Sequence, residues 1–130
     1  MIKKTIEYVD FNGNERKEDF YFNLTTAEAT EIEMSTTGGL SEMVTRIVNA
    51  GDTPAIIKVF KDLILKSYGE KSDDGKKFIK VRNGVSLGEE FAQTEAYSVL
   101  FMELATDAEK AADFFNALIP KSKESNKQTS

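Results

Sequence analysis

The chain contains no cysteine and no histidine. Without cysteine it has no disulfide, no thiolate nucleophile and no zinc–thiolate site, and it is suited to a reducing compartment. Without histidine it lacks the usual general base at neutral pH and the commonest metal ligand. These two absences remove most designs of hydrolases, transferases and metalloenzymes. We therefore expect a protein that is not an enzyme and that uses no cofactor or metal.

The sequence also lacks long apolar runs and an excess of basic residues. Nowhere do about 18 apolar residues follow one another, and residues 1–20 contain no continuous apolar stretch. We therefore expect no membrane span, no signal peptide and a cytoplasmic location. The net charge is -5, whereas proteins that bind nucleic acids normally present a basic surface to the phosphates. DNA and RNA are not expected partners.

What the chain does have is enough apolar side chains to form a core. Of its 130 residues, 40% are hydrophobic and 10% are aromatic, which is typical of one domain. We predict a single α+β domain at residues 1–119, mainly α, in which a β-hairpin at residues 1–24 precedes a bundle of about five helices at residues 25–119. Residues 120–130 carry no core-forming side chain, so we expect them to be a disordered tail.

The hairpin is predicted from two stretches that alternate apolar and polar residues. These stretches run from Ile2 to Val9 and from Glu18 to Leu24, and the alternation is typical of half-buried strands. A two-residue turn would place the two apolar stripes on opposite faces of the sheet, whereas a loop of three or five residues joins them on one face. We therefore predict an odd loop, which sets Ile6 across from Phe20 or Phe22.

The segment between the strands has a second possible meaning. Asp10, Asn12 and Asn14 have the alternate spacing of a calcium-binding loop. Such a loop needs glycine at its sixth position and glutamate at its twelfth, where this chain has Glu15 and Tyr21. We therefore interpret the segment as a turn. The positive φ angle that the turn requires is expected at one of two residues, Gly13 or Asn14.

Three pairs of residues have the spacing of a capping box, in which Ser or Thr precedes Glu by three positions and satisfies free amides at a helix start. They are Thr25 with Glu28, Ser86 with Glu89, and Thr106 with Glu109. The first predicted helix runs to about Met34. The second continues through Leu104, with a possible break near Gln93 or Thr94, and the third ends at Pro120.

Two further helices are predicted from apolar residues spaced three and four apart. One runs from residue 40 to Gly51 and buries Leu40, Met43, Val44, Ile47 and Val48. The other begins at Pro54, ends at Gly69 and buries Ile56, Ile57, Phe60, Leu63, Ile64 and Tyr68. In the last helix of the chain the inward residues are Ala108, Ala111, Ala112, Phe115, Leu118 and Ile119. A charged connection follows Gly69, with a short extended piece at residues 78–81.

Charge is distributed unevenly along the chain. Residues 54–82 hold 8 basic and 4 acidic residues, whereas residues 83–113 hold 1 basic and 7 acidic residues. These two regions can attract each other within one chain or between neighbouring copies. The second possibility would favour self-association.

Some apolar residues exceed what a single inward helix face requires. Leu65 projects well away from its inward-facing neighbours, and Val99 and Met102 fall outside the apolar stripe of their helix. Either that helix is central and buried, or these side chains form a surface for a partner. Leu65, Val99 and Met102 are therefore the candidate partner-binding residues.

In their order and amino-acid sequence, these segments resemble those of the tail assembly chaperones of long-tailed bacteriophages. The resemblance rests on three stretches, which are "KTIEYVDFNGNERKEDFYFNLTTAE", "LILKSYGEKSDDGKKFI" and "FAQTEAYSVLFMELATDAEKAADFFNALIP". None of them is a catalytic signature. The resemblance covers residues 1–119 and lies in the overall amino-acid sequence of these stretches. Residues 81–88 do not align clearly with the family pattern.

This resemblance implies a function without catalysis. Chaperones of this kind coat the long, apolar tape measure protein in many copies, keep it soluble and help the tail tube to polymerise around it. A frameshifted long form is thought to recruit the major tail protein, and this chain is similar to the short form. The resemblance further implies location in the host cytoplasm and absence from the mature virion. The alternative is a small structural tail or head–tail joining protein that stays in the virion.

Overall fold

The computed structural model describes residues 1–35 and 53–118, together with residues 38, 39, 42, 45, 46, 49 and 51 between them. The first two strands are β1 (Ile2–Val9) and β2 (Glu15–Phe22), and helices α1 (Thr26–Ser35) and α3 (Thr53–Ser67) come next. Four short strands then follow, namely β3 (Tyr68–Lys71), β4 (Phe78–Ile79), β5 (Val81–Arg82) and β6 (Val85–Ser86). The last elements are α4 (Leu87–Phe91), α5 (Glu95–Thr106) and α6 (Ala108–Leu118).

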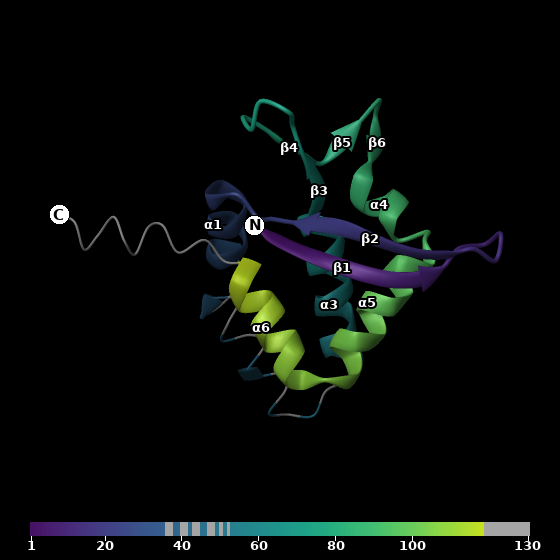
Figure 1. The fold of residues 1–130 in the computed structure, drawn as a ribbon. Coiled ribbons are helices and arrows are strands. Elements are labelled where there is room, and N and C mark those ends of the chain that lie inside the picture. Colours follow the sequence, from purple (N-terminus) through teal and green to yellow (C-terminus); the bar gives the residue numbers. More distant parts are fainter. Residues whose placement is uncertain are drawn as a thin grey trace.

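The strands form a four-stranded antiparallel sheet in the order β1-β2-β3-β4 and a separate pair of strands, β5-β6. Figure 1 shows α3, α5 and α6 on one side of the sheet, α1 beside its end, and the short strands β4, β5 and β6 projecting on the other side. The predicted α+β class, with an N-terminal hairpin followed by helices, is confirmed. The sheet is larger than predicted, because the connection after α3 adds two strands to it.

The loop between β1 and β2 has the predicted odd length. Val9 pairs with Glu15, so residues 10–14 form a five-residue loop, and Gly13 has a φ angle of 85°. The apolar stripes of the two strands therefore share one face, as predicted. The predicted partner of Ile6 is wrong, since Ile6 lies opposite Glu18. The reason is that a five-residue loop centred on Asn12 shifts the pairing by two residues without changing the face.

The inner face of the hairpin holds part of the aromatic core. Phe22 is completely buried, and its ring centroid lies 5.7 Å from that of Phe91 and 5.4 Å from that of Phe114. Tyr68 of β3 stacks on Phe91 at 4.5 Å with an interplanar angle of 11°. Each buried ring contributes about 1.5–3 kcal/mol by leaving water. This core joins the hairpin to α4 and α6.

The predicted helix starts are mostly confirmed by their caps. At α1, the Glu28 amide donates to the Thr25 hydroxyl at 3.2 Å and the Thr25 amide donates to the Glu28 carboxylate at 2.9 Å, which is the full capping box. Ser86 caps α4 by accepting from the Glu89 amide. The predicted break after α4 is also present.

The caps of the last two helices refine the prediction. Thr94 accepts from the Tyr97 amide and begins α5. The prediction that Thr106 starts the last helix is wrong, because Asp107 accepts from the Glu109 and Lys110 amides, both at 3.1 Å. The Thr106 hydroxyl instead donates to the Met102 carbonyl and stays in the last turn of α5. A carboxylate can reach two free amides at once, so Asp107 is the stronger cap.

Several predicted inward positions differ in the structure. Ile57 is 39% exposed and Ala112 is also exposed, while Phe114, which the spacing did not select, is buried. The helix α3 ends at Ser67, so Gly69 lies in β3 and does not stop the helix. The five predicted inward residues of the helix at residues 40–51, the Ile56 and Ala108 side chains, Ile119, Pro120 and the predicted tail lie outside what the structure describes.

Candidate functional site

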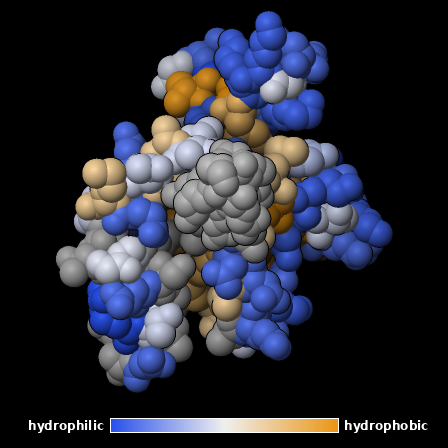
Figure 2. Space-filling model, turned by 90° about the vertical axis from the view of Figure 1, so that its left-hand side faces the viewer, coloured by the Kyte–Doolittle hydropathy of each residue, from blue (hydrophilic) through white to orange (hydrophobic). Residues whose placement is uncertain are grey.

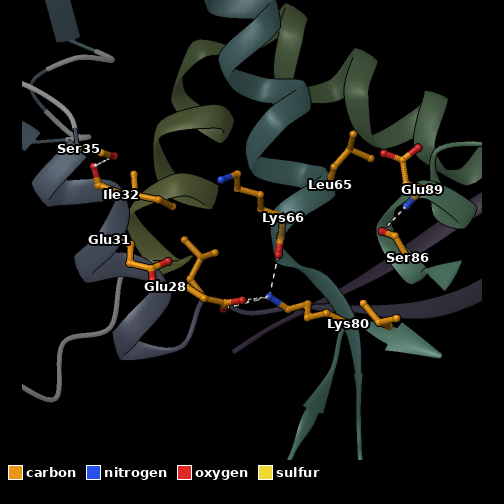
Figure 3. A pocket seen from close by; sticks show the side chains of 11 residues that line it. Glu28, Glu31, Ile32, Ser35, Leu65, Lys66, Lys80, Ser86 and Glu89 are labelled. Atoms are coloured by element: carbon orange, nitrogen blue, oxygen red, sulfur yellow. Dashed lines mark hydrogen bonds and ion pairs between the residues drawn. The ribbon is translucent and has the colours of Figure 1, made fainter. Parts of the chain in front are cut away.

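A groove of about 560 Å³ opens between α1, α3 and the segment that leads from β4 to α4. Its lining comes from Leu24, Glu28, Glu31, Ile32, Ser35, Leu65, Lys66, Lys80, Val81, Ser86 and Glu89. Figure 3 shows these side chains arriving from both sides of the groove, with α1 on one side and α3 and α4 on the other. We take this groove as the candidate site.

One lysine holds the two sides of the groove together. Lys80 Nζ donates to both carboxylate oxygens of Glu28 at 3.0 Å and to the backbone carbonyl of Lys66 at 2.7 Å (Figure 3). Lys66 lies in the last turn of α3, where carbonyl groups have no partner within the helix. Lys80 therefore caps the end of α3 and binds the start of α1 with the same ammonium group.

The charge of Glu28 is stabilised by these contacts. Burial by itself would raise the pKa of the Glu28 carboxyl, but the Thr25 amide and the Lys80 ammonium outweigh it and hold the pKa below its ordinary value. The carboxylate form is thus the form that fits the groove. Because this side chain is still 38% exposed, solvent weakens the ion pair relative to a buried one.

The groove combines an apolar floor with acidic borders. Leu24 is buried, and Ile32 and Leu65 are half-buried. Glu31 and Glu89 are exposed at the borders, and neither forms an ion pair with a cation of the described chain. Figure 2 shows this side of the molecule as largely hydrophilic, with hydrophobic side chains gathered mainly in its upper part.

The three predicted partner residues do not lie in one place. Leu65 lines the groove and is half-buried, whereas Val99 and Met102 lie on the outer side of α5. The exposed fractions of Val99 and Met102 are 39% and 56%. These two are three residues apart, so they are neighbours on one helix face. The alternative that α5 is apolar because it is buried on all sides does not apply at this face.

Comparison with known families decides which proteins this chain resembles. A family model described as phage tail assembly chaperone matches residues 1–129. The chain belongs to this family. No curated protein and no solved structure matches it. Family membership connects the chain to the assembly of phage tails.

The site of this tail assembly chaperone was only partly visible in its sequence. The surplus of apolar residues on the helices identified Leu65, but Lys80 and Val81 looked like part of a charged connection. Val81 is 58% exposed and extends the apolar lining of the groove. The one available signal for Lys80 was that a basic residue complements a helix C-terminus, and spacing alone does not say which helix a distant lysine will reach.

The lining of the groove is chemically simple. The side chains that line it are aliphatic residues, carboxylates, lysines and two serines. Within the described residues, no three carboxylates lie close enough together to hold a metal ion. No helix in that part of the chain is long and apolar enough to cross a membrane. An apolar floor with charged borders can receive a segment of another protein.

Proposed function

We propose that this chaperone binds the tape measure protein of its phage, keeps it soluble and promotes polymerisation of the tail tube around it. It acts through non-covalent contacts and is not an enzyme. Several copies act on one tape measure protein, in the host cytoplasm. Membership of the tail assembly chaperone family is the observation that carries this proposal.

The surface supports the proposal through its exposed apolar side chains. Val99 and Met102 offer apolar contacts on α5, and Leu65 offers one inside the groove. A long apolar helix presents side chains at intervals of three and four residues, which is the pattern that apolar grooves recognise. The net charge of -5 keeps the complex soluble once these apolar contacts are covered.

The proposal includes two further partners, which are the major tail protein and other copies of this chain. The major tail protein would be recruited through a frameshifted long form, and the chaperone would leave before the virion is complete. Mass spectrometry of purified virions tests this last point, because a chaperone should be missing from them. Recovery of the chain at the copy number of a structural component would instead favour a tail or head–tail joining protein.

The direct test is co-expression with the tape measure protein encoded in the same genome. The wild-type chain should bring that protein into the soluble fraction and co-purify with it. The variant Leu65→Ser/Val99→Ser/Met102→Ser should lose most of this effect while it keeps the circular dichroism of the wild type. The variant Phe11→Ser/Val85→Ser is the control, because it removes apolar side chains of 77% and 44% exposure from other surfaces.

Two outcomes would contradict the proposal. A folded triple variant that solubilises the tape measure protein as well as the wild type would show that these residues are not the contact. Failure of the wild type itself to bind or solubilise that protein would refute the function. If the triple variant does not fold, the double variant Val99→Ser/Met102→Ser is tested instead, because it changes exposed positions only.

A further inference from the structure

β1 forms an edge of the sheet. All eight of its residues pair with β2, from Ile2 opposite Phe22 to Val9 opposite Glu15. Among the described residues, no other strand pairs with β1. Figure 1 shows β1 along the margin of the sheet, with β2 on one side of it and no strand on the other. An edge of this length offers a row of backbone groups to another strand.

The hydrogen bond at the loop identifies which backbone groups face outward. The Asp10 amide donates to the Asn14 carbonyl at 2.9 Å, and on the other edge of β2 the Asn23 amide donates to the Ser67 carbonyl at 2.7 Å, so residues 10 and 14 face each other and residue 23 faces away from β1. In an antiparallel ladder, bonded and non-bonded pairs alternate. The even-numbered residues of β1 therefore bond to β2. The amides and carbonyls of the odd-numbered residues, Lys3, Thr5, Glu7 and Val9, face the open edge.

We propose that β1 pairs antiparallel with β1 of a second copy of this chain, with Thr5 opposite Thr5 of that copy. In this register Lys3 lies opposite Glu7 of the second copy, and by symmetry Glu7 lies opposite its Lys3. All of these residues have outward-facing backbone groups, so each opposite pair can exchange two hydrogen bonds. The two four-stranded sheets become one continuous sheet.

The charges select this register over its neighbours. Opposite charges that face each other across two strands stabilise the pair, and like charges destabilise it. Moving the centre of symmetry from Thr5 to Glu7 would place Glu7 opposite Glu7. Placing the centre of symmetry midway between Thr5 and Glu7 would separate Lys3 from Glu7, and neither would then lie opposite a residue of opposite charge. Only the Thr5-centred register joins both charge pairs.

The side chains on the outer face are available for this pairing. Lys3, Thr5 and Glu7 are all exposed. Lys3 has no ion-pair partner in the described part of the chain, and Glu7 has only the weak contact with Lys17 at 4.0 Å. In the dimer, Glu7 would lie between Lys17 of its own β2 and Lys3 of the second copy. Charges of alternating sign would then run across the two sheets.

This surface gives a structural basis to the self-association that the proposed function includes. It can be tested without any tail protein, so its failure and that of the proposed function are distinguishable. The variant Leu65→Ser/Val99→Ser/Met102→Ser should still form the dimer but should no longer bind the tape measure protein.

The test uses charge reversal and sedimentation velocity of the purified full chain. The wild type should form a dimer that dissociates at higher salt, because its charge pairs are exposed. Lys3→Glu alone and Glu7→Lys alone should each weaken the dimer about tenfold or more, since each variant places two like-charge pairs across the symmetric interface. An equimolar mixture of the two single variants should recover the dimer, because every pair across the mixed interface then joins opposite charges.

Two further variants keep the result unambiguous. The double variant Lys3→Glu/Glu7→Lys should dimerise like the wild type, because both charge pairs are restored with reversed sign. Lys61→Glu on α3 has the same net charge as Lys3→Glu and should leave the dimer unchanged, because Lys61 is an exposed helix residue far from β1 in the chain.

A proline variant tests the backbone rather than the charges. Thr5→Pro removes an amide that faces outward and that β2 does not use, so it should block dimerisation and leave the fold intact. A monomeric wild type at millimolar concentration would overturn the proposal. A dimer that survives both Thr5→Pro and the single charge reversals would also overturn it, because a different surface would then hold the copies together.

Discussion

Lys80 Nζ lies 3.0 Å from both carboxylate oxygens of Glu28, although the two residues are 52 positions apart in the chain. The same ammonium group donates to the Lys66 carbonyl at 2.7 Å. This contact connects α1, the end of α3 and the segment after β4. It is the main polar connection across the candidate groove.

Replacing Lys80 with methionine should lower the free energy of unfolding by about 1 kcal/mol. The variant removes an ion pair that is partly shielded from solvent and leaves the Lys66 carbonyl without its cap. Lys58→Met is the matched control, since it breaks an ion pair with Asp62 in which the two side chains are 77% and 51% exposed. Urea unfolding of both variants should show a clear loss for Lys80→Met and little change for Lys58→Met. Equal losses of stability in the two variants would show that the Lys80 contacts stabilise the fold no more than the exposed Lys58–Asp62 ion pair does.

The stability difference between the wild type and Glu28→Gln should depend on pH. The pKa of Glu28 is held below its ordinary value in the folded chain, so its contribution is complete above the glutamate value of about 4.3 and is lost as pH falls through the folded pKa. The wild type should therefore be the more stable protein at neutral pH, and the difference should shrink below pH about 4.3. Urea unfolding across this range measures it. A difference that stays constant down to the lowest pH would show that the Glu28 charge is not involved.

Replacing Gly88 with alanine should destabilise the packing of α4 on α3. A Cβ atom built at Gly88 would overlap the carbonyl oxygen of Leu65, and backbone cannot move aside as a flexible side chain does. Overpacking of this kind typically costs about 1–3 kcal/mol. Glu90→Ala changes an exposed residue of the same helix and should cost far less. Crystallography or hydrogen exchange at residues 87–91 would show whether α4 has moved.

Replacing Asp10 with alanine should loosen the five-residue loop of the hairpin. The Asp10 carboxylate accepts from the Asn12 and Asn14 amides, both at 2.9 Å, and also binds Arg16. These contacts hold the pKa of Asp10 below its ordinary value, with the Arg16 hydrogen bond as the largest cause. Hydrogen exchange at the two amides should become faster in the variant. Calcium should not protect them in the wild type, and protection by calcium would restore the metal-loop interpretation.

Local signals in the sequence were sufficient for the hairpin and for most helix starts. The alternation in β1 and β2 fixed the inner face, and the Thr25–Glu28 spacing located the start of α1, because both depend on neighbours in the chain. The strands after α3 were not predicted beyond a short extended piece. They are only two to four residues long, and β3 forms because β2 offers it an edge, through the pairs Tyr21–Gly69 and Phe22–Tyr68.

The candidate groove was harder to predict for the same reason. Its lining comes from residues 24–35, 65–66 and 80–89, and nothing in the spacing of one segment reports its distance from another. Surplus apolar residues led to the prediction of Leu65, Val99 and Met102, but such a surplus does not say whether the three side chains meet. In the structure, Leu65 lies in the groove and the other two lie on α5.

The burial of Phe22 against Phe91 and Phe114 also sets an order of events during synthesis on the ribosome. The hairpin that carries Phe22 is translated before the two rings named here, which belong to α4 and α6 and leave the exit tunnel after it. The aromatic face of the hairpin therefore stays exposed to water until nearly the whole domain has emerged. The chain proposed to cover apolar surface of another protein therefore exposes apolar surface of its own until its synthesis is nearly complete.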